Sequence, residues 1–282
     1  MRVLITGANG QLGKDLALYG KQVADVFALG KDQLDITKGS EVSQVIHSVT
    51  PDIIIHAAAY TAVDLCEVEQ KRAFDINSLG ALNIAKKAKE INAKMVYIST
   101  DYVFSGDKGA PYVEEDTPNP KSVYGMSKWL GEQIVQSTIE ESYIIRTSWL
   151  YGSGGNNFAK TMLKLAEQKK EVHVVNDQIG SPTYTKDLSK IIFQLIKKRY
   201  GIYHVSNLGQ CSWFTFARHI FKIAGYDSNL IKPISTKAYG AKAPRPAYSV
   251  LAHIELEKED IPIPRYWEEA IIEFIREELQ RD

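Results

Sequence analysis

The first half of the chain alternates short apolar runs with longer amphipathic stretches. Uninterrupted apolar runs of this length are typical of strands buried on both faces of a parallel sheet. Residues 42–49 and 73–88, which lie between such runs, carry apolar residues at helical spacing. The alternation predicts an α/β fold with a doubly wound parallel sheet. We place its strands at Val3–Ile5, Val26–Leu29, Ile53–Ile55, Met95–Ile98 and Tyr143–Ile145.

The pattern loosens after residue 148. A glycine- and asparagine-rich loop occupies residues 152–157, and strands and helices then follow in no regular alternation. We therefore predict a first domain over residues 1–148 and a smaller C-terminal lobe over residues 149–282, with some later segments returning to the first domain. Within the lobe we expect a strand at 172–175, a helix at 188–196, a helix through Phe221 capped by Ser212, and a terminal helix at 267–279.

Charge and cysteine content exclude some classes of partner. Lys plus Arg and Asp plus Glu both number 34 in the 282 residues, so the formal net charge is zero. The chain has no bulk electrostatic attraction for nucleic acid or an anionic membrane. Its two cysteines, Cys66 and Cys211, have no metal-ligand spacing and suggest reduced thiols. The sequence shows neither a secretory signal pattern nor an apolar run of transmembrane length, so we expect a cytoplasmic protein.

A single cleft should gather the polar and glycine-rich segments of the first domain. In sheets of this kind, ligands bind beyond the carboxyl ends of the strands. The segment from Thr6 to Gly13, the residues after Ile55 and the residues after Ile98 all follow predicted strands. We therefore expect these three segments to meet.

A glycine-punctuated turn follows the first strand. Gly7, Gly10 and Gly13 lie between that strand and a helix-compatible run, which is the context of a Rossmann-type phosphate site. The early glycines would allow a tight turn and close approach of a pyrophosphate, and the last would let the helix pack with its amino end toward the anion. The alternative is a strand-to-helix turn without a ligand. Candidate dinucleotide-binding residues here are Gly7, Asn9, Gly10, Gln11, Leu12 and Gly13.

Tyr124 and Lys128 stand four residues apart, and residues at this spacing share one face of a helix. A neighbouring ammonium would lower the pKa of the phenol, which is normally about 10, and make it a better acid. Thr100, directly after the fourth strand, could hold a substrate carbonyl while Tyr124 protonates it. A Tyr/Lys pair also occurs by chance. Together with the glycine turn, however, the three residues predict reduction of a carbonyl by a nicotinamide cofactor.

The end of the second strand bears on the choice of nicotinamide cofactor. The segment Ala28–Lys31 offers no carboxylate where an NAD-specific enzyme usually binds the ribose. Lys31 could instead meet a 2′-phosphate, although a lysine at a strand end is often only solvated. We therefore favour NADPH and expect NADH to be usable.

The equal gaps between the three glycines, with the Tyr-x-x-x-Lys pair, resemble the extended branch of the short-chain dehydrogenase/reductase superfamily. The resemblance implies that Lys128 also holds the nicotinamide ribose and that Asn77 completes a proton relay. Asn77 could equally be a helix residue bonded to the backbone. The resemblance adds Ala57, Ala58 and Ala59 to the cofactor-binding residues, together with Asp35 and Ile36 as an adenine-contacting pair. Asp35 and Ile36 could also form only a turn before a helix.

Several segments resemble the dTDP-4-dehydrorhamnose reductase family within this branch. Tyr102 occupies the place where a nucleotide-sugar dehydratase would carry a glutamate, which disfavours elimination. The resembling segments are Ser99–Phe104, Ala57–Asp64, Arg146–Gly152, Asp177–Thr183 and Ala243–Pro246. The resemblance implies reduction of the C4 ketone of dTDP-4-dehydro-β-L-rhamnose, the last step in making that activated sugar. Another nucleotide-sugar reductase or epimerase and a non-catalytic, cofactor-binding regulatory subunit are the alternatives.

Substrate contacts implied by the resemblance come from both parts of the chain. Trp149 would wall the sugar site, although a tryptophan at a strand end is often core. Arg245 would clamp the diphosphate, because a guanidinium fork matches phosphate oxygens, or would simply be an exposed arginine between prolines. Some relatives use magnesium at a dimer contact. This chain shows no carboxylate cluster for it and leaves a homodimer open. The predicted substrate-binding residues are Val63, Thr100, Asp101, Tyr102, Phe104, Tyr124, Trp149 and Arg245.

Overall fold

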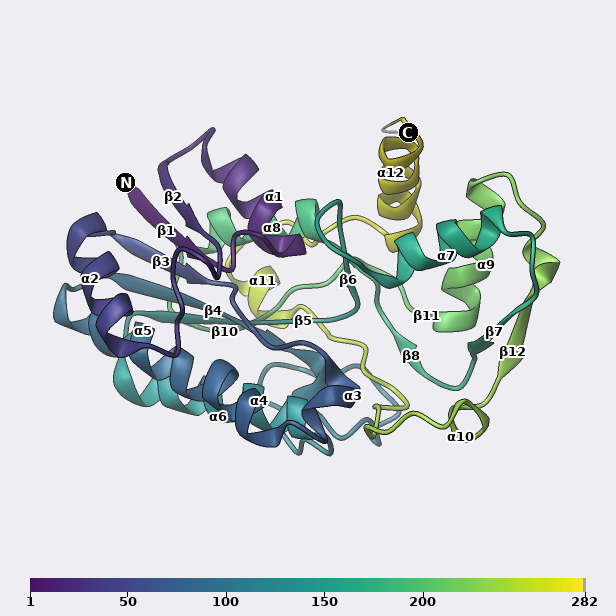
Figure 1. The fold of residues 1–282 in the computed structure, drawn as a ribbon, viewed down its shortest axis with the longest axis horizontal. Helices are drawn as coiled ribbons and strands as arrows, with labels where there is room; N and C mark the ends of the chain where they lie inside the picture. Colours follow the sequence, from purple (N-terminus) through teal and green to yellow (C-terminus); the bar gives the residue numbers. More distant parts are fainter. Residues whose placement is uncertain (281–282) are drawn as a thin grey trace.

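A six-stranded parallel sheet forms the centre of the computed structural model, which describes residues 1–280. The strand order is β10-β5-β4-β3-β1-β2 (Figure 1). Each predicted strand is present, which confirms the predicted fold class. The strands are β1 (Arg2–Thr6), β2 (Asp25–Leu29), β3 (Ile53–His56), β4 (Lys94–Thr100), β5 (Ser142–Thr147) and β10 (Gly201–His204).

Helices cover both faces of this sheet, because side chains alternate between the faces along each strand. Val3 and Ile5 pack into one buried cluster and Leu4 into another. The first cluster includes residues of α1 (Gln11–Gly20), α8 (Thr185–Leu195) and α11 (Ile254–Lys258). The second includes residues of α2 (Gly39–Val49), α5 (Gly80–Glu90) and α6 (Val123–Thr138). This two-sided burial explains why the strands have uninterrupted apolar sequences.

The chain reverses direction across the sheet beside β1. Strand β2 pairs with one edge of β1 and β3 pairs with the other. The connections therefore leave β1 and β3 in opposite directions and open a crevice beyond their carboxyl ends. Short elements follow those ends: α3 (Val63–Cys66), α4 (Gln70–Phe74), the π-helical segment η1 (Asp75–Leu79) and the 3₁₀ turn η2 (Asp101–Val103).

The C-terminal lobe has its own apolar core, to which α7, α9 and α12 contribute. It lies beside the sheet in Figure 1. Its helices are α7 (Phe158–Glu167), α9 (Trp213–Ile223), α10 (Thr236–Tyr239) and α12 (Trp267–Leu279), with the 3₁₀ turn η3 (Ser228–Leu230). Its short strands pair as β6 (Leu150–Tyr151) with β9 (Thr183–Tyr184), β7 (Val172–Val175) with β12 (Ile231–Ile234), and β8 (Ile179–Gly180) with β11 (Cys211–Ser212).

The predicted elements of this lobe are confirmed at 172–175, at 267–279 and in the helix capped by Ser212, whose Oγ accepts from Thr215 N at 3.1 Å. Strand β10 and helix α8 pack on the central sheet. The division into domains at residue 148 stays a prediction. None of the helices in residues 1–280 is both long and apolar enough to cross a membrane.

Candidate active site

Two cavities of about 1100 and 530 Å³ lie along the carboxyl ends of the strands. They share lining residues at the glycine turn and after β3, namely Gly7, Gly10, Ala57 and Ala59. Together they make an elongated site whose two chambers meet at the turn. That shape suits a dinucleotide, with its pyrophosphate at the junction and one nucleoside in each chamber.

The turn at the junction requires glycine for two separate reasons. Gly7 has a φ of +70°, and a Cβ there would lie 2.7 Å from Ala58 Cα. A Cβ on Gly13 would collide with the carbonyl oxygen of Gly7. Gly10 caps α1 without a side-chain hydrogen bond, and the first turn of α1 has no acidic residue. The amino end of α1 is thus left to attract an anion.

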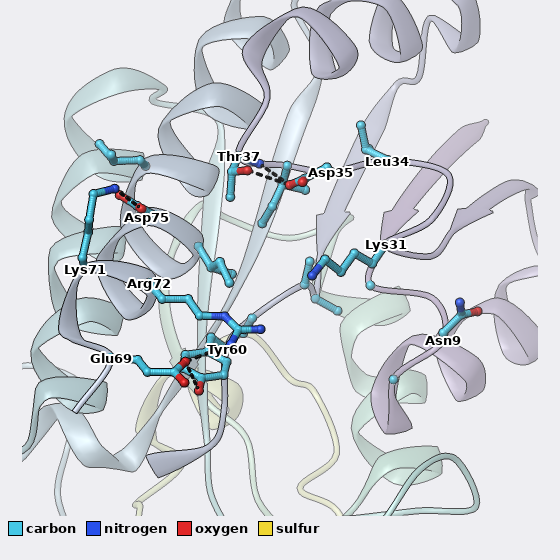
Figure 2. Close-up of a pocket in the computed structure, with 18 of the residues that line it drawn as sticks. Asn9, Lys31, Leu34, Asp35, Thr37, Tyr60, Glu69, Lys71, Arg72 and Asp75 are labelled. Carbon is cyan, nitrogen blue, oxygen red and sulfur yellow. Dashed lines mark hydrogen bonds and ion pairs between the residues drawn. The ribbon is translucent and has the colours of Figure 1, made fainter. Parts of the chain in front are cut away.

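The larger cavity contains the residues predicted to bind adenosine. Lys31, Asp35 and Ile36 line it, and Figure 2 shows Lys31 and Arg72 extending toward its middle from opposite sides. Asp35 Oδ1 accepts from Thr37 N at 3.0 Å and from Thr37 Oγ1 at 2.7 Å, and these bonds hold the pKa of Asp35 below its usual value. Asp35 therefore forms the Asp-Ile-Thr turn that was the alternative to an adenine contact, and it also lines the cavity.

The smaller cavity brings together Thr100 from the end of β4 and Tyr124 and Lys128 from α6. Ser122 caps α6, with Oγ accepting from Gly125 N at 3.1 Å. One turn beyond Lys128, Glu132 forms a fully buried ion pair with Arg146 of β5 at 2.8 Å. These contacts fix α6 against the sheet. Thr100 Oγ1 donates to Asp101 Oδ1 at 3.0 Å, so its hydroxyl is also oriented.

The ionisation of Tyr124 and Lys128 differs from the sequence prediction. Burial raises the pKa of Tyr124, and a hydrogen bond with Thr100 opposes this rise. Burial also lowers the pKa of Lys128, to about 7. Lys128 Nζ lies 4.0 Å from the ring centroid of Tyr97. Desolvation thus opposes the charged form of Lys128, the form through which it would act on Tyr124.

Asn77 lies in the π-helical segment and is fully buried. Its Oδ1 accepts from Tyr60 N at 2.8 Å, and its Nδ2 donates to Tyr60 O at 3.1 Å and to Ser127 Oγ at 2.9 Å. The two bonds to Tyr60 agree with the alternative interpretation, in which Asn77 binds the backbone and takes no part in a proton relay. The three bonds together fix the segment after β3 to α6, and the relay role of Asn77 stays a prediction.

Three buried polar atoms of residues lining the smaller cavity have no hydrogen-bond partner within residues 1–280. They are Gln11 Oε1, Asp101 Oδ2 and Thr147 Oγ1. Buried polar groups are rarely left unpaired in folded proteins, so these atoms fit a polar ligand that completes them. Burial raises the pKa of Asp101 to about 6. Hydrogen bonds from Ser249 and Thr100 oppose this rise, and a ligand hydroxyl that donates to Asp101 would favour the carboxylate further.

The predicted substrate-binding residues are only partly brought together. Val63, Asp101, Tyr102 and Trp149 line the smaller cavity with the three candidate catalytic residues. Phe104 does not line it. The 3₁₀ turn η2 carries that ring into a core cluster, where it stacks on Tyr112 at 4.2 Å.

Arg245 does not line the described cavities either. Its guanidinium binds both carboxylate oxygens of Asp64, at 3.1 and 2.8 Å. The fork proposed for a diphosphate is therefore occupied by a carboxylate, which also accepts from Ala243 N at 3.0 Å. The Nε hydrogen of Arg245 takes no part in these bonds, and its role at the diphosphate stays a prediction.

Sequence reasoning missed several residues that line the site, including Thr147, Ser148, Arg72 and Trp213. Thr147 and Ser148 stand at the end of β5, so the rule of strand ends could have found them. Arg72 and Trp213 carry no local signal. Trp213 begins α9 and reaches the cavity only through the packing of the C-terminal lobe on the sheet.

No group of three metal-binding side chains occurs among residues 1–280. We predict that treatment with a chelator leaves turnover within about twofold of the untreated protein, since the described residues form no cluster of carboxylates for Mg²⁺. The assay compares initial rates before and after chelation and after adding Mg²⁺ back. Complete loss of activity that Mg²⁺ restores would contradict this prediction.

The parallel sheet with its switch point, the glycine turn and the Tyr124/Lys128 helix define a nucleotide-binding protein of the extended short-chain dehydrogenase/reductase class. Comparison with known proteins refines this class. A family model described as the RmlD substrate binding domain matches residues 1–280. The chain belongs to the dTDP-4-dehydrorhamnose reductase family.

Relatives resemble the chain over nearly its whole length. It is 48% identical to a spore coat polysaccharide biosynthesis protein, SpsK, of Bacillus subtilis (strain 168), covering 98% of this chain and 97% of that protein. It is 40% identical to a dTDP-4-dehydrorhamnose reductase of Aggregatibacter actinomycetemcomitans, covering 96% and 97%. Among solved structures, a dTDP-4-dehydrorhamnose reductase of Bacillus anthracis in complex with NADP matches with a TM-score of 0.95 and 48% identity, over 98% and 99% of the two chains.

Proposed function

We propose that this protein reduces the C4 ketone of dTDP-4-dehydro-β-L-rhamnose to dTDP-β-L-rhamnose, with NADPH as the preferred reductant and NADH also accepted. The observation that carries the proposal is the position of Thr100, Tyr124 and Lys128 in one cavity that continues to the glycine turn. Relatives named dTDP-4-dehydrorhamnose reductase support the choice of substrate. The reaction would complete the synthesis of an activated sugar, and the relative SpsK supports a use in polysaccharide synthesis.

Each residue of the cavity has a distinct task in this proposal. The raised pKa of Tyr124 keeps its phenol protonated at neutral pH, which suits a donor that must give a proton to the developing alkoxide. Thr100 donates its one hydroxyl hydrogen to Asp101, and it would turn this hydrogen toward the ketone oxygen when the substrate binds. Lys128 would hold the nicotinamide ribose hydroxyls. A bound NADPH would supply the hydride.

The larger cavity supports NADPH over NADH. The turn after β2 carries glycine at residue 30 and no ribose-binding carboxylate, and the Asn9 amide packs against this glycine. Lys31 lies beside it in the same cavity. A relative of known structure is described in complex with NADP.

Lys31→Ala is expected to weaken NADPH binding by about tenfold and to leave NADH binding unchanged, because a charge-assisted contact to the 2′-phosphate is lost. Titration of each cofactor by fluorescence or calorimetry would measure this. Lys38→Ala is the matched control, since Lys38 is exposed and pairs with Glu41 at 2.8 Å. Equal weakening of both cofactors would refute a 2′-phosphate contact.

Two alternatives from the same fold are less well supported. A dehydratase would need a base beside the ketone, and Tyr102 stands at that position with a pKa raised by burial. A non-catalytic regulatory subunit would not need Thr100, Tyr124 and Lys128 in one cavity. Location in the cytoplasm and assembly into a homodimer stay predictions.

The test of the proposed function is NADPH oxidation by the purified protein, with dTDP-4-dehydrorhamnose generated in place by a 4,6-dehydratase and a 3,5-epimerase. Oxidation should require all components, and the product should co-elute with dTDP-β-L-rhamnose. Binding of NADPH without oxidation would contradict a reductase and favour the regulatory subunit. Oxidation only with another 4-keto nucleotide sugar would change the substrate and keep the chemistry.

A further inference from the structure

Trp149 adopts a backbone conformation that is unusual for a bulky residue. Its φ is +47°, in the left-handed region that disfavours side chains of this size. Within residues 1–280, the other non-glycine residues with positive φ are Thr50, Asn92, Lys169 and Asp260, each within two residues of the end of a helix. Trp149 instead lies between β5 and β6, at the cavity. Strained residues persist only where their surroundings hold them.

Hydrogen bonds from the C-terminal lobe hold the backbone on both sides of Trp149. Ser148 Oγ donates to Ser181 O at 2.7 Å, and Thr183 N donates to Trp149 O at 3.2 Å. Strand β6 then pairs with β9, with Leu150 opposite Thr183. Gly180 lies so close that an added Cβ would be 2.7 Å from Nε1 of the Trp149 indole. These bonds hold the backbone of Trp149, and Gly180 packs against one part of its indole ring.

Trp213 stacks on this ring. The two indoles are nearly parallel, at 7°, with centroids 3.6 Å apart. Trp213 is in turn held at the start of α9, where Ser212 Oγ accepts from Thr215 N, and by the Phe158 ring at 4.6 Å. The pairing of β11 with β8 also brings the two rings together. Cys211, two residues before Trp213, lies opposite Gly180, which packs against the Trp149 ring.

We propose that Trp213 is a positioning and specificity-determining residue that orients the Trp149 indole as the apolar wall of the sugar site. Stacking over the full ring face restricts the rotation of Trp149 about its side-chain bonds, which the backbone hydrogen bonds alone do not. The wall then stands ready for the apolar face of a deoxy sugar before the sugar binds, so less rotational freedom is lost on binding. The inference rests on the proposed function, since it assigns this wall to the sugar of that substrate.

The test replaces Trp213 with leucine, which keeps an apolar side chain and removes the ring face. We expect KM for the nucleotide sugar to rise about tenfold, kcat to stay within about threefold and NADPH affinity to be unchanged, because Trp213 would act on sugar binding and not on proton transfer. The exciton signal of two stacked indoles in circular dichroism should disappear. Trp213→Phe should restore part of the affinity and tests the same point if the leucine variant does not fold.

Trp129→Phe is the matched control. Trp129 packs against a core cluster and lines neither described cavity, so its replacement should leave both KM and the exciton signal unchanged. An unchanged KM in active Trp213→Leu and Trp213→Phe variants would overturn the inference, and so would an exciton signal that survives in them. Failure of the wild-type protein to turn over the substrate would instead contradict the proposed function. In that case, the affinity of the same variants for dTDP-rhamnose would still test whether Trp213 orients the Trp149 ring for sugar binding.

Discussion

Tyr124→Phe is expected to lower kcat by at least ~10²-fold, because it deletes the proton donor and keeps the ring. The ring contributes to packing through an edge contact with Tyr102 at 5.6 Å, and this contact would survive the change. Affinity for NADPH should change by less than about twofold, since the phenol hydroxyl serves the ketone. Single-turnover rates and cofactor titration would measure the two effects separately.

The control for this variant is Tyr19→Phe, which removes a phenol hydroxyl outside both cavities and should leave kcat unchanged. A Tyr124→Phe protein with near-normal kcat would remove Tyr124 from the proposed mechanism. Equal losses in kcat and cofactor affinity would show instead that the change disturbs the fold of the cavity.

Lys128→Ala is expected to reduce both kcat, by about 10²-fold, and NADPH affinity, by about tenfold, because the residue would hold the cofactor ribose as well as supply positive charge beside Tyr124. Lys128 is only 2% exposed, so truncation also leaves a cavity. Lys128→Met fills most of that space without the charge and separates the two causes. Unaltered cofactor affinity in both variants would contradict the ribose contact.

The pKa of Lys128 gives this prediction a pH dependence. Burial lowers that pKa to about 7, so the ammonium is present mainly below pH 7 in the cofactor-free protein and is lost as the pH rises through it. NADPH affinity should therefore fall from about pH 6 to pH 8 in the wild-type protein, to the extent that the charge contributes. The Lys128→Met protein should show a flatter profile. Equal slopes for the two proteins would exclude Lys128 as the titrating group.

The part of the site that depends on local pattern was predictable from the sequence. The apolar runs located five strands of the sheet, and the rule that ligands bind at strand ends placed the glycine turn and Thr100 at one cleft. The place of each of these residues in the cleft is determined by the strand or helix that carries it. The spacing of Tyr124 and Lys128, for example, needs only one continuous helix, and α6 supplies it.

Contacts between distant segments were not predictable in the same way. Trp213 reaches Trp149, 64 residues earlier in the chain, because β8 pairs with β11, and nothing near either residue indicates that pairing. Arg245 is bound by the carboxylate of Asp64, which lies 181 residues earlier and which no local pattern indicated. The pKa of Tyr124 likewise follows from its burial by several elements, whereas spacing alone suggested the opposite direction.

The measurement that tests the central claim most directly is the transfer of deuterium from NADPH labelled at the reactive C4 position to the sugar. With dTDP-4-dehydrorhamnose as substrate, the account predicts dTDP-rhamnose with one deuterium at C4 of the sugar, formed by the wild-type protein and at least ~10²-fold more slowly by Tyr124→Phe. Oxidation of the labelled cofactor without deuterium at the sugar C4, or equal rates of transfer by the two proteins, would contradict it.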